Sequence, residues 1–199
     1  TSLTEVTGTN NVTTVGERAF YGCTALTSIV LPTATTIGDE AFCKCSALTS
    51  ITATEVTKIG DSAFNGANIV NINFPNLSVI GAEAFANNDE VKTVTLGAVT
   101  QMGNEVFKNC SEITSVTFGD GTTTIGAYAF YSAKNNTALK TVNLPDSVET
   151  IGDYAFYNLV AVKTINLSGV TTIGNYALYN TKSLSGVDIA NVKTIGDYA

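Results

Sequence analysis

The sequence of 199 residues contains no histidine and no tryptophan, and only 14% of its residues are charged. The absence of histidine removes the usual general base, the Ser-His and Cys-His pairs of nucleophilic enzymes, and imidazole metal ligands. The glycines recur singly along the chain and do not cluster into a phosphate-binding loop. We therefore expect a protein that is not an enzyme and that uses no metal and no cofactor.

Basic residues are also scarce, because ten Lys and Arg stand against 17 Asp and Glu, for a net charge of -7. Nucleic-acid binding needs clustered cations to neutralise phosphates, so nucleic acid is excluded as a partner, and anionic membranes are disfavoured. No apolar run approaches the roughly 18 residues that span a bilayer. The first residues lack the basic and apolar segments of a signal peptide, so we expect any export signal to lie outside this chain.

What the sequence does contain is a repeat, marked by an apolar residue followed by glycine. The intervals between these pairs are 21 to 26 residues, which is typical of a solenoid. The apolar residues are Val15, Ile37, Ile59, Ile80, Met102, Ile125, Ile151, Ile173 and Ile195. We expect one solenoid domain over residues 1–199, with about nine coils. The ninth copy stops at "TIGDYA", and we expect the chain to be part of a longer protein.

Each repeat is expected to form one short parallel strand and one short helical turn, which makes the fold class α/β. The strand follows from apolar residues two apart, as in Ile29 and Leu31, because this is the period of a strand with one buried face. The helical turn is expected after the glycine. Gly38 would supply a turn conformation, Asp39 would cap the helical turn, and Phe42 would fill the core.

A phenylalanine stands four residues after most of these glycines, and we expect the rings of successive coils to stack into a buried spine. Its members are Phe20, Phe42, Phe64, Phe85, Phe107, Phe130 and Phe156, with Leu178 as the departure. Removal of one ring would leave a cavity between coils.

The pattern L-x-x-I-x-L-P at Leu26 to Pro32, combined with V-x-x-I-G-x-x-A-F and Cys45 or Cys110 eight residues after the Ile, resembles the BspA-like leucine-rich repeats of bacterial cell-surface proteins. The resemblance covers the whole chain. It implies a right-handed leucine-rich-repeat horseshoe, and surface-displayed or secreted proteins that bind other macromolecules in adhesion, including host matrix proteins. It supplies no catalytic residues.

The regularly placed acidic residues and the cysteines are interpreted as structural. Glu17, Asp39, Asp61, Asp153 and Asp197 follow the recurring glycines, where capping is favoured over a catalytic or Ca²⁺-binding role. The cysteines are expected to be reduced, with Cys43 alone exposed. A disulfide between Cys23 and Cys45 in neighbouring coils is the alternative, and a zinc site is disfavoured because paired C-x-x-C elements are missing.

Two surfaces are candidate binding sites. The outward face of the predicted sheet carries uncharged hydrogen-bonding side chains, which strand propensity alone would explain but which could also bind a protein or a glycan. Its central members are Thr93, Thr95, Ser115, Thr117, Thr141, Asn143, Thr164 and Asn166.

The second candidate is a stripe of tyrosines, confined almost entirely to the C-terminal half, at positions two and five after the glycine. It comprises Tyr128, Tyr131, Tyr154, Tyr157, Tyr176 and Tyr179, with Tyr198 continuing it. The rings could stack on one another to cover the edge of the core, or they could form an aromatic contact strip for a partner. The longest repeat, of 26 residues, contains "YSAKNNTAL", which we interpret as a surface loop that could carry binding.

The sequence therefore favours a non-catalytic, adhesin-like binding module of a bacterial cell-surface or secreted protein, located outside the cell. The partner would be a protein, such as a host matrix protein, or a glycan, and this fragment would not insert directly into a membrane. The alternatives are a passive structural spacer and a glycan-binding accessory region of a larger surface protein.

Overall fold

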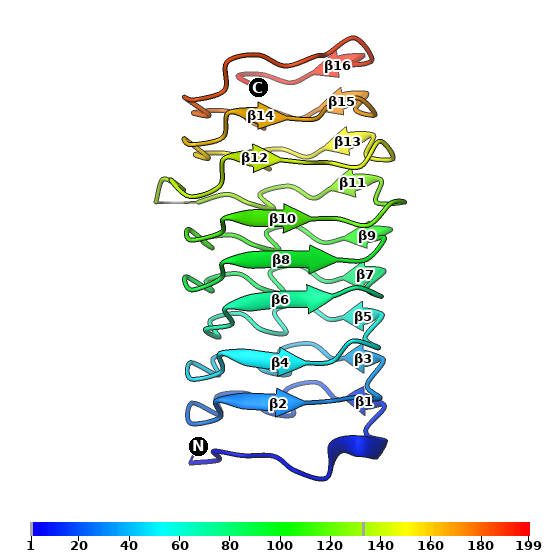
Figure 1. Cartoon of the computed structure of the whole chain (residues 1–199), viewed down its shortest axis with the longest axis vertical. Coiled ribbons are helices and arrows are strands. Elements are labelled where there is room, and N and C mark those ends of the chain that lie inside the picture. The colour runs from blue at the N-terminus through cyan, green and yellow to red at the C-terminus, as the bar shows by residue number, and fades with distance from the viewer. Residues whose placement is uncertain (1, 133) are drawn as a thin grey trace.

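The computed structural model describes residues 2–132 and 134–199, and it shows a stack of coils with two rows of short strands (Figure 1). The first row consists of β2 (Ser28–Val30), β4 (Ser50–Thr52), β6 (Asn71–Phe74), β8 (Thr93–Leu96), β10 (Ser115–Thr117), β12 (Thr141–Val142) and β14 (Thr164–Ile165). The second row consists of β1 (Thr14–Val15), β3 (Thr36–Ile37), β5 (Lys58–Ile59), β7 (Val79–Ile80), β9 (Gln101–Met102), β11 (Thr124–Ile125), β13 (Thr150–Ile151), β15 (Thr172–Ile173) and β16 (Thr194–Ile195). All the strand pairs are parallel.

The first row is the strand that the sequence predicts. Ile72 and Phe74 of β6 are buried, whereas Asn71 and Asn73 between them are exposed. The same alternation holds in β8 and β10, and neighbouring strands pair in register. The predicted alternation of buried and outward residues is therefore confirmed.

The second row corrects the expectation of one strand per repeat. Its strands are two residues long, and each ends in the apolar residue that precedes the recurring glycine, as Ile37 and Ile59 do. Both rows have the ordinary spacing of paired strands, about 4.8 Å per coil. The two sides of the stack therefore have similar lengths, and Figure 1 shows a nearly straight stack in place of the expected horseshoe.

The predicted helical turn is wrong. Apart from the 3-10 turn η1 (Thr9–Asn11), the described residues contain no helix, and the segment after each glycine consists of successive tight turns. The physical reason is a left-handed backbone two residues after the glycine, as at Glu40 (φ 52°) and Ser62 (φ 52°). Such residues interrupt a right-handed helix.

Because no helix forms after the glycine, alternate backbone N–H groups of this turn segment donate to carbonyl oxygens of the next coil. The N–H groups of Glu40, Phe42 and Lys44 donate to the carbonyl oxygens of Asp61, Ala63 and Asn65, at 2.7–2.8 Å. The turn segment thus forms a third ladder of hydrogen bonds between coils. In a helix these N–H groups would donate to carbonyl oxygens of the same segment, whereas here the carbonyl oxygens of the next coil accept them.

The recurring glycine allows neighbouring coils to approach each other closely, and it does not supply a special turn conformation. This corrects the interpretation of Gly38. Its φ is not in the left-handed region, but a Cβ built on it would lie 2.8 Å from the backbone nitrogen of Glu17 in the preceding coil. At Gly60 the corresponding distance to the backbone nitrogen of Asp39 is 2.6 Å. A side chain at these positions would push neighbouring coils apart.

Three of the five regularly placed acidic residues cap backbone groups, but of the next coil and not of a helix. Asp39 Oδ1 accepts the N–H of Asp61 at 2.9 Å, and Asp61 Oδ1 accepts the N–H of Ala82 at 2.7 Å. Asp153 does the same for Asn175. These carboxylates therefore join coils, a role that needs neither a metal nor a substrate.

The phenylalanine spine is confirmed. Successive rings from Phe20 to Phe156 stack with centroids 5.0–5.8 Å apart. Phe42, Phe64 and Phe85 are completely buried, whereas Phe20 in the first coil is half-buried. The spine belongs to one continuous apolar core that extends from Val15 to Ala177.

All four cysteines are free thiols and all are buried. The expected reduced state is found, but the expected exposure of Cys43 is wrong, because 7% of this residue is accessible. Its short side chain does not extend to solvent as Tyr21 does at the same position one coil earlier. Burial raises the pKa of Cys45 to about 11 and that of Cys110 to about 12.

The strand ladders are interrupted between the coils that contain Gly103 and Gly126. In the second row one sheet ends at β9 and the next begins at β11. In the first row, β10 and β12 are linked by the single bridge between Thr117 and Asn143. The 23- and 26-residue intervals of the sequence fall at these coils. The first row is also interrupted between β4 and β6, where the repeat has ordinary length.

Candidate functional site

The outward residues of the first row form a continuous uncharged face, here called the strand face. Thr93 is half-buried, and the other predicted members from Thr95 to Asn166 are exposed. Thr93 Oγ1 donates to Asn71 Oδ1 at 2.7 Å, which links β8 to β6. Asn73, Thr95, Thr117 and Asn143 lie in one row across four coils.

A shallow depression interrupts this face between β10 and β12, where the strand pairing is incomplete. It has a volume of about 460 Å³, and four predicted residues line it: Ser115, Thr117, Thr141 and Asn143. Lys140 lies at the same depression. The structure thus brings four of the eight sequence-predicted residues of this face around one concavity. Thr164 and Asn166 lie one coil further along, on β14 and just after it.

The tyrosine stripe consists of two columns of stacked rings. Tyr128, Tyr154, Tyr176 and Tyr198 stack with centroids 4.7–4.9 Å apart. Tyr131, Tyr157 and Tyr179 stack at 5.2 Å. The columns touch each other within each coil, as at Tyr154 and Tyr157, whose centroids are 5.5 Å apart.

Stacking covers both faces of the inner rings, such as Tyr154 and Tyr157, whereas the end rings Tyr179 and Tyr198 have a stacking partner on one face. Tyr154 is half-buried because Tyr128 and Tyr176 cover its two faces. Desolvation raises its pKa, and the neighbouring tyrosines add to this effect. Tyr179 at the end of its column is 43% exposed. The rings stack on one another, as the first interpretation expects, and the aromatic contact strip for a partner stays a prediction.

In the coils that precede Tyr128, the same two positions carry different side chains apart from Tyr21. Arg18 Nη2 donates to Glu40 Oε1 at 2.6 Å, and Lys108 Nζ donates to Glu105 Oε2 at 2.8 Å. The bond to Arg18 lowers the pKa of Glu40. The fold therefore does not require tyrosine at these positions.

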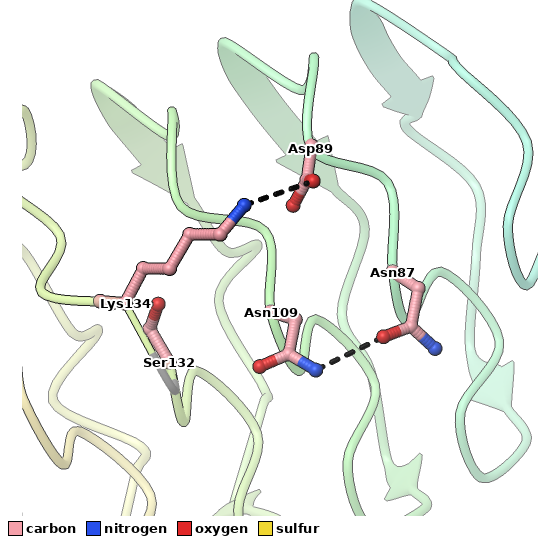
Figure 2. Close-up of a pocket in the computed structure, with 5 residues that line it drawn as sticks. All are labelled: Asn87, Asp89, Asn109, Ser132 and Lys134. Carbon is pink, nitrogen blue, oxygen red and sulfur yellow. Dashed lines mark hydrogen bonds and ion pairs between the residues drawn. The ribbon is translucent and has the colours of Figure 1, made fainter.

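Sequence reasoning missed a polar pocket of about 200 Å³ that is formed partly by the inserted loop (Figure 2). Its lining consists of Asn87, Asp89, Asn109, Ser132 and Lys134. Asn109 Nδ2 donates to Asn87 Oδ1 at 2.9 Å, and Lys134 Nζ lies 3.5 Å from Asp89 Oδ2. The 26-residue repeat pointed to this loop, but it did not reveal which earlier coils the loop would meet.

Comparison with known proteins identifies the repeat. The pattern described as the BspA type leucine rich repeat region matches residues 1–92 and 78–199, in six copies. The chain belongs to the BspA-type leucine-rich repeat family. A search of curated proteins gives no match. In the part of the chain that the structure describes, no helix is long and apolar enough to cross a membrane.

Two solved structures show how this BspA-type chain relates to others. A leucine-rich repeat protein from Bacteroides ovatus is 30% identical, with a TM-score of 0.73, and the match covers 85% of this chain and 45% of that one. The T. pallidum leucine-rich repeat protein is 23% identical, with a TM-score of 0.62 over 87% of this chain and 72% of that one, and it shows the fold alone. The chain thus spans less than half the length of the Bacteroides ovatus protein.

Proposed function

We propose that this BspA-type chain is a non-catalytic, adhesin-like module that binds a macromolecule outside a bacterial cell. Leucine-rich repeats of this kind are generally protein-binding modules. The observation that carries the proposal is the clustering of Ser115, Thr117, Thr141 and Asn143 around one depression of the strand face. An uncharged, exposed surface of hydroxyl and amide groups suits extended recognition by a solenoid.

A double substitution tests the contact surface. The chain is first screened against immobilised matrix proteins and glycans, and the strongest partner is kept. Thr95→Lys with Thr117→Lys places two charged side chains on the exposed strand face and should abolish that binding, while the circular dichroism spectrum and the thermal melt stay nearly unchanged. The control carries Thr24→Lys and Ser46→Lys, which are exposed residues outside the strand face.

Two results would count against the proposal. Retained binding by the strand-face variant would move the contact elsewhere, and failure of the parent chain to bind any partner would favour a passive spacer. Surface location is tested separately, by adding protease to intact cells that express the native protein. Digestion before lysis supports an extracellular location, and protection contradicts it.

A further inference from the structure

The pocket of Figure 2 lies beside a row of asparagine side chains in which one position is a serine. An amide ladder runs along the coils, in which Asn109 donates to Asn87 and Asn87 Nδ2 donates to Asn65 Oδ1 at 3.0 Å. In the next coil Ser132 takes the equivalent position, and Asn158 donates to the carbonyl oxygen of Ser132 at 2.9 Å. The pocket therefore forms where an asparagine side chain is replaced by a shorter one.

The extra residues of the longest repeat provide one wall of the pocket. Lys134 lies on this loop, and its ammonium group reaches back to Asp89, as Figure 2 shows. The Ser132 hydroxyl donates to the carbonyl oxygen of Lys134, which ties the loop to the coil. Most side-chain positions of this solenoid recur from coil to coil, whereas this arrangement combines the inserted loop with Asn87, Asp89 and Asn109.

The chemistry of the lining favours a neutral ligand with several hydroxyl groups. The five described residues that line the pocket carry amide, hydroxyl, carboxylate and ammonium groups, while the carbon atoms of the lining contribute most of its accessible surface. One carboxylate and one ammonium group lie 3.5 Å apart, and their charges cancel. A hydroxyl both donates and accepts, so neighbouring hydroxyls can bond to a carboxylate, an ammonium group and amides together. The volume of about 200 Å³ is smaller than that of pockets for drug-sized ligands and suits a single ring.

We infer that the pocket lined by Asn87, Asp89, Asn109, Ser132 and Lys134 binds one neutral sugar residue of a glycan. This inference goes beyond the proposed function, because the pocket shares no residue with the depression of the strand face.

The test uses immobilised oligosaccharides that end in neutral hexoses, in N-acetylated hexosamines or in sialic acid. The parent chain should bind at least one neutral glycan, whose affinity is then measured by isothermal titration calorimetry. Lys134→Ala and Asp89→Asn should each weaken binding by tenfold or more. Both side chains are more than half exposed, so the variants should keep the thermal melt of the parent.

Two matched variants control for charge. Lys182→Ala removes an exposed lysine at the same repeat position two coils further on, and Glu90→Gln neutralises the exposed residue after Asp89. Each should change the affinity less than twofold. Equal affinities for the pocket variants and the parent, preference for sialylated glycans, or no glycan binding would overturn the inference. Capture of a matrix protein without glycan binding would leave the proposed function standing, and binding to neither would remove both.

Discussion

The ring of Tyr154 lies face to face on the ring of Tyr176, with centroids 4.7 Å apart, although both residues have a left-handed backbone. A left-handed conformation costs about 1–2 kcal/mol for a residue with a Cβ, and aromatic pairs return about 0.5–1.5 kcal/mol each. Tyr157 stacks similarly on Tyr179 but is not among the residues with positive φ. The two columns therefore differ in backbone strain while sharing the same packing.

Asparagine substitutions should separate these two contributions. Asparagine tolerates the left-handed region, so Tyr154→Asn loses stacking but gains relief of strain, and we expect a net change below about 1 kcal/mol. Tyr157→Asn loses stacking without relief and should destabilise by about 1–2 kcal/mol. Urea denaturation of both variants measures the difference. Equal losses would show that the strain at Tyr154 is negligible.

The glycine at the start of each turn segment should tolerate alanine only in the first coil. In Gly60→Ala the new Cβ would lie within 2.6 Å of a backbone nitrogen, and we expect a loss of roughly 3 kcal/mol from overpacking. Gly16→Ala meets no atom within 4 Å and should be neutral or stabilise by up to about 1 kcal/mol. Melting temperatures of the two proteins provide the comparison. A similar loss at both sites would contradict the close-approach explanation.

Removal of one spine ring should be among the most damaging single changes. Phe85→Ala deletes a completely buried ring and should destabilise by about 3–5 kcal/mol. Phe20→Ala, at the half-buried start of the spine, should cost clearly less. Guanidinium denaturation monitored by circular dichroism gives both values. An unchanged melt for Phe85→Ala would refute the buried spine.

The buried thiols should make stability fall at alkaline pH. Burial raises the pKa of Cys110 from 9.0 to about 12, so between these values the unfolded chain loses the proton while the folded chain keeps it. The contribution is complete below about pH 9, and between pH 9 and pH 12 the free energy of unfolding decreases by about 1.4 kcal/mol per pH unit. Cys110→Ser keeps a donor for the carbonyl oxygen of Phe85 but does not titrate. Urea denaturation at pH 8, 9 and 10 should show a smaller decrease for this variant, and parallel curves would contradict the assignment.

Apart from the burial of Cys43, the sequence predicted the features that depend on which apolar side chains form the core. Ile72 and Phe74 were placed correctly because their spacing matches a strand, and the spine followed from one phenylalanine per repeat. The helical turn was wrong because Glu40 and Ser62 give no sequence signal for a left-handed backbone. Asn87 and Asn109 do give a sequence signal for a left-handed backbone, since asparagine favours that region.

The second row of strands and the pocket were harder to predict for different reasons. Two-residue strands such as β3 contain one apolar residue, which is too few to show a period. The pocket depends on which coils the inserted loop contacts, those of Asn87 and Asn109, and the spacing of the repeats does not predict that contact. The tyrosine stripe was predicted from position alone, and its stacking follows from the register of the coils.

The interruption of both strand ladders beside Met102 and Asn143 divides the chain energetically. In a solenoid each coil is stabilised mainly by its neighbours, so an interface with fewer ladder bonds is the weakest link in cooperativity. Across this interface the turn segment still bonds, as Phe107 N–H does to Ala129 O, and Phe107 stacks on Phe130. We expect hydrogen exchange to resolve two foldons that meet here, so that the tyrosine-bearing half can open and reclose while the N-terminal half stays folded.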